Sequence, residues 1–154
     1  MSAFVHEGGL KLRQKVRAVV INEHGEFLLV RPHGYPEGEW TLAGGGVEDD
    51  ETAHQAMRRE IAEELGVTLE EGLERLPVGN RFIYSAEHKA QKALDHDGQD
   101  AAMFVVRLPN DAPLALQAEE LADARWFTAS DALAAFPVAK QREVFEACLN
   151  AIAA

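Results

Sequence analysis

The sequence predicts a compact α+β domain, and three observations lead to that fold class. Short segments rich in Val, Leu and Ile alternate with turns marked by Gly and Pro, which is typical of strands and helices in one compact unit. Hydrophobic residues make up 47% of the 154 residues, which excludes a disordered chain. Neither repeats nor low-complexity linkers divide the sequence, so we expect a single domain over residues 1–154.

The first half of the chain should begin with a β-hairpin. Residues 15–21 and 26–31 are apolar segments, and the turn between them contains Gly25. A loop over residues 32–38 and a short strand over residues 39–43 should follow. Residues 44–51 are rich in glycine and then acidic, so we expect a loop there.

A helix should begin after this acidic loop. Thr52 and Gln55 fit a capping box, and Gly66 supplies the stop signal. The positions between them place an apolar stripe on one helix face: Ala53, Ala56, Met57, Ile61 and Leu65.

The second half should contain three more strands and two more helices. Residues 81–85, 101–108 and 124–128 are the expected strands, with a long polar loop over residues 86–100. Ser130 can cap a short helix that runs through Phe136, and Pro137 can open a last helix over residues 138–151.

Charge and composition exclude several classes of protein. The formal net charge is −11, from 15 basic and 26 acidic residues, which argues against a stable nucleic-acid partner. Anionic substrates remain compatible, because bound metal ions can invert the local field. Cys148 is the only cysteine, so an intramolecular disulfide is excluded, and we expect this thiol in the core. Without a signal peptide or an apolar run of about 20 residues, we expect a cytoplasmic protein that does not bind membranes.

Three glutamates cluster near the end of the helix that Thr52 begins. At about 100° per residue, Glu60, Glu63 and Glu64 lie within an arc of roughly 100° on the helix surface. Like charges at these spacings repel, and the helix macrodipole disfavours anions near the C-terminus. Local interactions therefore oppose the arrangement, and a bound cation is the simplest partner for it.

The segment around these glutamates, residues 45–67, resembles the Nudix box. That pattern is Gly, five residues, Glu, seven residues, Arg-Glu, an aliphatic residue, any residue, Glu-Glu, any residue, Gly and an aliphatic residue. All of its fixed positions are matched here: Gly45, Glu51, Arg59, Glu60, Ile61, Glu63, Glu64, Gly66 and Val67. The resemblance implies the Nudix fold, an α/β/α sandwich around a mixed β-sheet, and an enzyme that hydrolyses phosphoanhydride bonds.

The resemblance also implies roles for individual residues. Glu60, Glu63 and Glu64 would bind Mg²⁺, or Mn²⁺ in its place, with Gly45 beside them, because Mg²⁺ prefers oxygen ligands. Glu51 and Arg59 would form the ion pair that fixes the preceding loop. A further acid often comes from a later loop, and Glu120 is the candidate, with Glu119 as its rival.

Two points of this assignment stay open. The general base can be Glu63, Glu64 or Glu120. Many Nudix sequences also have Pro where Ala43 stands before three glycines, so we expect a less restrained loop there.

Features outside the box indicate the substrate class. Tyr84 lies 17 residues after Val67, a spacing similar to that of the dinucleoside polyphosphate hydrolases, and Gly98-Gln99 is similar to a dipeptide of the diadenosine tetraphosphate and RNA 5′-pyrophosphohydrolase branch. Tyr84 can instead be a half-buried strand residue. Arg31, His33 and Tyr35 lie near where a base could stack, and Lys89 and Lys92 can reach phosphates or remain surface lysines.

These features favour a pyrophosphohydrolase that acts on a nucleoside diphosphate linked to another moiety, with dinucleoside polyphosphates as the preferred substrates. The alternatives are a MutT-type nucleoside triphosphate pyrophosphatase, then an ADP-ribose pyrophosphatase or an enzyme of capped RNA. Outside the enzymes, a non-catalytic Nudix domain could sense a nucleotide, although the box is intact. A homodimer is compatible with the sequence.

Overall fold

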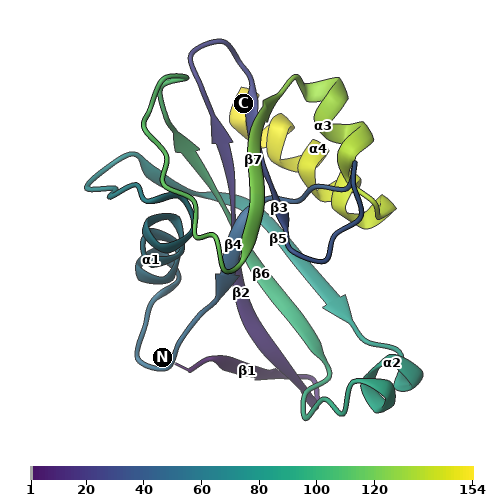
Figure 1. The fold of residues 1–154 in the computed structure, drawn as a ribbon. Helices are drawn as coiled ribbons and strands as arrows, with labels where there is room; N and C mark the ends of the chain where they lie inside the picture. Colours follow the sequence, from purple (N-terminus) through teal and green to yellow (C-terminus); the bar gives the residue numbers. More distant parts are fainter. Residues whose placement is uncertain (1) are drawn as a thin grey trace.

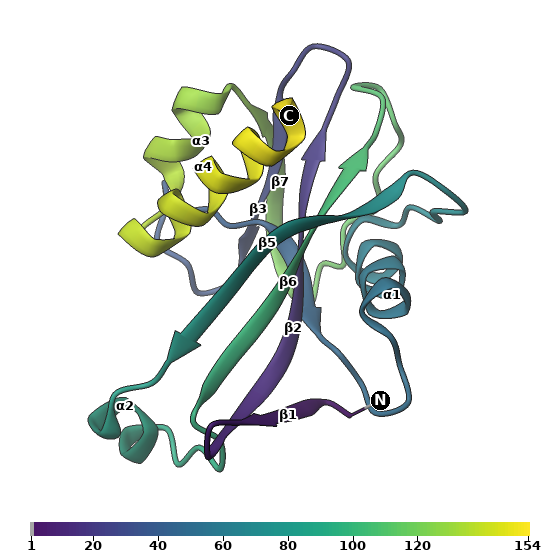
Figure 2. The same ribbon diagram turned by 180° about the vertical axis from the view of Figure 1, so that it is seen from behind.

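The structure is a computed structural model that describes residues 2–154, and it has three layers (Figures 1 and 2). A mixed seven-stranded sheet forms the middle layer. Helix α1 (Ala53–Leu65) covers one face, and helices α3 (Ala129–Ala135) and α4 (Ala139–Ala153) cover the other. This arrangement confirms the predicted α+β class and the sandwich.

The long strand β2 lies in the middle of the sheet and pairs with four other strands. The seven strands are β1 (Phe4–Glu7), β2 (Leu10–Ile21), β3 (Phe27–Pro32), β4 (Ala43–Gly46), β5 (Leu73–Ile83), β6 (Gly98–Arg107) and β7 (Leu121–Phe127). On one side β2 pairs in parallel with β6 over most of its length. On the other side it pairs antiparallel with β1, β4 and β3 in turn. The order β5-β6-β2-β3-β7 therefore places β2 and the short β4 in the centre of the molecule.

Alternation along β2 divides its side chains between the two helical layers. Val16, Ala18 and Val20 pack toward α1, whereas Val19 joins the cluster under α3 and α4. Cys148 is fully buried in the second cluster, as expected. No helix within residues 2–154 is long and apolar enough to cross a bilayer.

Helix α1 begins and ends where the sequence predicts. Thr52 and Gln55 form the capping box, and Gly66 ends the helix with a φ of 70°, which glycine adopts without strain. The end of α1 also holds the segment before β7, because the Ala115 amide donates to the Leu65 carbonyl at 2.9 Å and the Gln117 amide to the Glu64 carbonyl at 3.1 Å. The acidic helix and the segment that carries Glu120 are thereby fixed to each other.

Two expectations about residues 39–51 are wrong. Of the strand expected over residues 39–43, only Ala43 lies in a strand, and Thr41 makes only an isolated bridge to Val30. The strand begins instead at Ala43 and includes the three glycines, which we expected in a loop. The pairing with β2 explains the difference, since β4 lies opposite Lys15–Ala18 and local sequence does not show that partner.

Other boundaries also differ from expectation. Residues 86–100 are not one loop, because Ser85 caps a short helix α2 (Ala86–Gln91) beyond the end of β5 (Figure 1). Strand β5 starts eight residues earlier than expected, and it ends before Tyr84. Thr128, not Ser130, accepts the capping hydrogen bond of α3. Strand β1 was not expected from the sequence.

Candidate active site

The buried acidic residues of α1 face the glycines of β4. Glu60 and Glu64 are only 9% and 5% exposed. The Gly44 amide donates a hydrogen bond to Glu64 Oε1 at 2.8 Å. A Cβ atom on Gly45 would lie 2.3 Å from Glu60 Oε1. The carboxylates of Glu60 and Glu64 can therefore approach strand β4 because Gly44 and Gly45 have no side chains.

The flanking glycines of β4 meet equally close neighbours. A Cβ atom on Gly44 would lie 2.0 Å from the Val16 carbonyl oxygen, and one on Gly46 would lie 2.2 Å from Arg13 Nη2. The expectation of a less restrained loop is thus wrong. The three glycines are restrained by pairing with β2 and by contacts on both sides.

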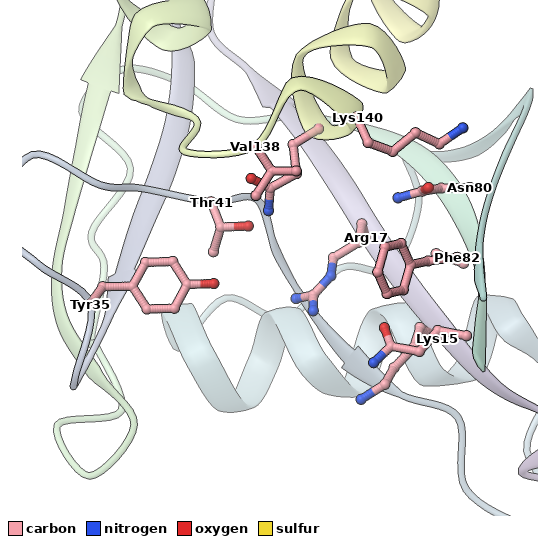
Figure 3. A pocket seen from close by; sticks show the side chains of 11 residues that line it. Lys15, Arg17, Tyr35, Thr41, Asn80, Phe82, Val138 and Lys140 are labelled. Atoms are coloured by element: carbon pink, nitrogen blue, oxygen red, sulfur yellow. The ribbon is translucent and has the colours of Figure 1, made fainter. Parts of the chain in front are cut away.

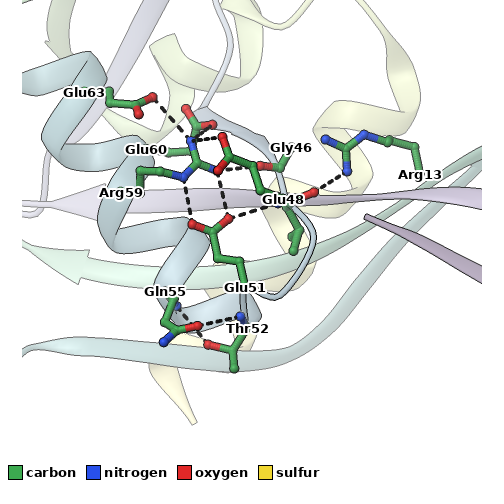
Figure 4. A network of polar contacts seen from close by, with 10 residues as sticks. Arg13, Gly46, Glu48, Glu51, Thr52, Gln55, Arg59, Glu60 and Glu63 are labelled. Atoms are coloured by element: carbon green, nitrogen blue, oxygen red, sulfur yellow. Dashed lines mark hydrogen bonds and ion pairs between the residues drawn. The ribbon is translucent and has the colours of Figure 1, made fainter. Parts of the chain in front are cut away.

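Arg59 joins the acidic residues of the box into one network (Figure 4). Its Nε and Nη2 atoms donate to the two carboxylate oxygens of Glu51 at 2.8 and 2.9 Å, and Nη2 also donates to the Gly46 carbonyl at 2.8 Å. Its Nη1 atom donates to Glu60 at 3.0 Å and to Glu63 at 3.3 Å. The bidentate pair fixes the loop before α1, which is the arrangement that the resemblance to the Nudix box implied for Glu51 and Arg59.

A nearby positive charge would stabilise the buried carboxylates of Glu60 and Glu64 as anions. The pKa of Glu64 is raised to about 7, mainly by burial; the Glu60 and Glu120 charges act in the same direction, and the Gly44 hydrogen bond and the Arg17 charge act against it. Burial also raises the pKa of Glu60, although Arg59 acts in the opposite direction. Both carboxylates are therefore poorly stabilised as anions by the protein itself.

The donor set fits a hard divalent cation. Within residues 2–154 no three acidic, histidine or cysteine side chains already converge as a metal cage. The contacts explain this, because Arg59 holds Glu60 and Glu63 while Gly44 holds Glu64. Carboxylate oxygens on one helix face, two of them buried and incompletely neutralised, are nevertheless the ligand type that such cations prefer.

The structure favours Glu120 over Glu119 as the additional acid. The Glu120 charge acts on the pKa of both Glu60 and Glu64. The Glu120 carbonyl accepts a hydrogen bond from the His33 amide at 3.0 Å, which ties the segment to the end of β3. Its role in catalysis stays a prediction.

A pocket opens on the opposite face of the sheet from α1, between β5 and the start of α4, and we call it the β5–α4 pocket (Figure 3). Its volume is about 210 Å³. The lining combines cations, amides and aromatic rings: Lys15, Arg17, Tyr35, Thr41, Asn80, Phe82, Gln99, Ala101, Val138, Lys140 and Gln141. Arg17 links the pocket to the glutamates, because its charge also lowers the pKa of Glu64.

The four residues that the sequence proposed for substrate binding lie elsewhere. Tyr84 packs against His88 and His96 near α2, with ring centroids 5.2 and 5.4 Å away. Lys89 is ion-paired to an aspartate, Arg31 lies over the Trp40 ring, and Lys92 ends α2. None of them lines the β5–α4 pocket, and their proposed roles stay predictions. Tyr35, which we placed near a stacked base, does line it.

The sequence carried a signal for the cations of this pocket. Basic residues recur at every second position in β2: Lys11, Arg13, Lys15 and Arg17. Period-2 alternation places such residues on one face of a strand.

Comparison with known proteins agrees with this geometry. Residues 11–148 match the family model described as the NUDIX domain. The chain belongs to the Nudix family. As a Nudix hydrolase it is an enzyme that acts on phosphoanhydride bonds, and members of this family generally need a divalent metal ion.

Two relatives and one solved structure are similar to this chain over most of its length. The nucleoside triphosphatase NudI of Klebsiella pneumoniae is 31% identical over 119 residues, which cover 73% of this chain and 79% of that protein. The RNA pyrophosphohydrolase of Sulfurovum is 32% identical over 120 residues, 75% of each chain. The solved structure of the E. coli dihydroneopterin triphosphate pyrophosphohydrolase shares the fold, with a TM-score of 0.75, 21% identity, and coverage of 92% of this chain and 96% of that one.

Proposed function

We propose that this enzyme is a Mg²⁺-dependent pyrophosphohydrolase of nucleoside triphosphates, with Mn²⁺ as a substitute metal. The observation that carries the proposal is the pair of buried, incompletely neutralised carboxylates of Glu60 and Glu64 against the glycine strand. Glu63 completes the acidic face of α1, and Arg17 lies between this face and the β5–α4 pocket.

The residues of the chain support a simple hydrolysis. Bound metal ions would neutralise the phosphates and make phosphorus more electrophilic. A water oxygen forms the new bond to phosphorus, the phosphoanhydride bond breaks, and the departing phosphate group takes the bond electrons. The water proton goes to a carboxylate, for which Glu63, Glu64 and Glu120 are the candidates. Glu51 and Arg59 position the loop and the helix, and they do not need to touch the substrate.

Three observations support a triphosphate substrate over the dinucleoside polyphosphate that the sequence favoured. NudI and the E. coli structural neighbour are both named for triphosphates. A pocket of about 210 Å³ lies below the range of drug-sized ligand sites, so it suits a single heterocycle. The packing of the strands alone explains the glycine at position 98, because a Cβ atom there would lie 2.2 Å from the Phe82 carbonyl oxygen. Gly98 therefore does not need a role in binding a dinucleoside polyphosphate.

A dinucleoside polyphosphate remains the second candidate. Gln99 of the Gly98-Gln99 dipeptide lines the β5–α4 pocket, which keeps part of the sequence argument for that branch. Tyr84 contacts Phe82 of the same pocket through an edge-to-face pair with ring centroids 5.8 Å apart.

A hydrolysis screen with product analysis tests the proposal. Nucleoside triphosphates, diadenosine tetraphosphate, dihydroneopterin triphosphate and ADP-ribose are compared at equal concentration with Mg²⁺, and products are separated by ion-exchange chromatography. We expect the highest kcat/KM with a triphosphate, which yields a monophosphate and pyrophosphate. A higher kcat/KM for diadenosine tetraphosphate would favour the second candidate, and binding without turnover would favour a nucleotide sensor. The single domain, a possible homodimer and the cytoplasmic location stay predictions.

A further inference from the structure

We propose that His33 is a positioning residue of the acidic site, because its backbone amide and its ring both hold the turn that carries Glu120. This role rests on the proposed function and belongs to a residue outside the Nudix box. His33 acts through Glu120, and it does not need to touch the substrate or a metal ion.

A tight turn carries Glu120 into strand β7. The Gln117 carbonyl accepts hydrogen bonds from the Glu120 amide at 3.0 Å and from the Leu121 amide at 2.9 Å, which closes the turn over residues 118–120. The Glu120 charge raises the pKa of both Glu60 and Glu64, so its carboxylate lies near the two buried acids. A shift of this turn would therefore change the electric field at the candidate metal ligands.

Helix α1 fixes the chain only before the turn. The Ala115 amide donates to the Leu65 carbonyl, and the Gln117 amide donates to the Glu64 carbonyl. Figure 1 shows the segment before β7 as it passes α1 and then turns back into the strand. Both of these contacts precede residue 118, so the turn itself needs a partner on its other side.

His33 supplies that partner with two hydrogen bonds. Its amide donates to the Glu120 carbonyl at 3.0 Å, and its ring Nε2 lies 2.6 Å from the Ala118 carbonyl oxygen. A carbonyl oxygen only accepts hydrogen bonds, so Nε2 carries the proton and donates it. One residue thus ties the first and the last residue of the turn to the end of β3.

The sequence before His33 explains why a side chain is needed there. Strands β3 and β7 are paired through Pro32 and Leu121, with a bulge between Arg31 and Pro32. Proline has no backbone N–H, so it cannot donate to β7 at this position. His33 is the next residue with an N–H, and its ring adds a second donor. A bulge can re-aim a side chain in this way.

Substitution of the exposed His33 ring tests its role. His33→Ala keeps the backbone amide but removes the ring donor, so kcat for nucleoside triphosphates should fall by about two- to tenfold with little change in KM. The Kd of Mn²⁺, measured by calorimetry without substrate, should rise by a similar factor, because Glu120 is displaced. His33→Gln keeps a side-chain N–H donor and should restore most of both values. His24→Ala is the matched control, since His24 is exposed in the distant β2–β3 turn, and it should change neither value.

A double-mutant cycle decides whether His33 acts through Glu120. In a Glu120→Gln background, His33→Ala should cause no further loss of kcat or of Mn²⁺ affinity. Losses of the same size in both backgrounds would overturn the role of His33, whatever the melting temperatures.

The same measurements separate this role from the proposed function. A loss of Mn²⁺ affinity that depends on Glu120, in a protein that hydrolyses no triphosphate, would uphold the positioning role and contradict the function. Triphosphate hydrolysis and Mn²⁺ binding that are both unchanged in His33→Ala would overturn the positioning role and leave the function standing.

Discussion

The acidic site and the β5–α4 pocket are built in opposite ways. The acidic site comes mainly from one continuous stretch, residues 45–67, which folds as a glycine strand, a loop and helix α1. The pocket comes from β2, β5, β6, α4 and a loop, whose residues lie up to 126 positions apart, from Lys15 to Gln141. The acidic site is thus assembled from local sequence, whereas the pocket is assembled by tertiary contacts.

Because the acidic site and the pocket are separate, we expect substitutions in the acidic site to reduce turnover and to leave substrate binding in the pocket intact. Glu64→Gln should lower kcat by about 10²- to 10⁴-fold, the range expected for an essential acid–base or ligand carboxylate. The metal-free variant should unfold at an equal or higher temperature, because a buried charge is removed while the Gly44 hydrogen bond can remain. Stopped assays and thermal unfolding measure the two effects. Near-normal turnover would show that Glu64 is not central to the site.

Alanine substitutions of the β4 glycines should separate an effect on the stability of the fold from an effect on turnover. Gly44→Ala should destabilise the fold strongly, because its Cβ atom would clash with backbone at Val16. Gly45→Ala meets only the end of the Glu60 side chain, which can rotate, so the fold should survive while kcat falls by roughly tenfold or more. Gly79→Ala is the control, because nothing lies within 4 Å of its added Cβ atom. Equal melting temperatures for Gly44→Ala and Gly79→Ala would contradict this explanation.

The ion pair that positions the acidic site should contribute stability that depends on pH. Hydrogen bonds from Arg59 lower the pKa of Glu51 below its usual value near 4.5. The stabilisation is therefore complete above about pH 4.5 and is lost as the pH falls through the lowered pKa. Glu51→Gln should reduce the free energy of unfolding by about 1–3 kcal/mol at pH 7, and the difference should shrink in acid. Urea unfolding at several pH values checks this, and a difference that grows in acid would refute it.

The smallest effect is expected at Tyr84, which supports the pocket only indirectly. Tyr84→Phe removes a hydroxyl that lies 3.3 Å from His96 Nε2 but keeps the ring against Phe82. We expect less than a threefold change in KM, against about tenfold or more for Phe82→Ala. Steady-state kinetics with one triphosphate measure the effect, and a larger effect for Tyr84→Phe would support Tyr84 as a direct substrate residue.

Local signals in the sequence were enough for most of the fold and for the acidic site. The capping box of Thr52 and Gln55 and the stop at Gly66 depend on a few adjacent residues, and α1 follows them. The Glu51–Arg59 ion pair was implied by the resemblance to the Nudix box, and both residues lie within one continuous stretch of sequence. These features could be predicted because no distant partner decides them.

The sequence did not predict features of the structure that depend on residues far apart in the chain. The glycines of β4 form a strand only because β2 lies beside them, and they offer no strand propensity of their own. Asn80 and Gln141 meet in one pocket although 60 residues separate them. Strand β5 ends at Ile83, so Phe82 lines the pocket whereas Tyr84, whose role stays a prediction, lies beyond the strand.

The most direct test of the central claim is the rate of nucleoside triphosphate hydrolysis against free Mg²⁺ after the protein has been stripped with EDTA and dialysed. We predict no measurable turnover in the stripped enzyme and a saturable return of activity with Mg²⁺ or Mn²⁺, with a monophosphate and pyrophosphate as products. Full turnover without added metal would contradict the assignment of the Glu60, Glu63 and Glu64 cluster as a metal site.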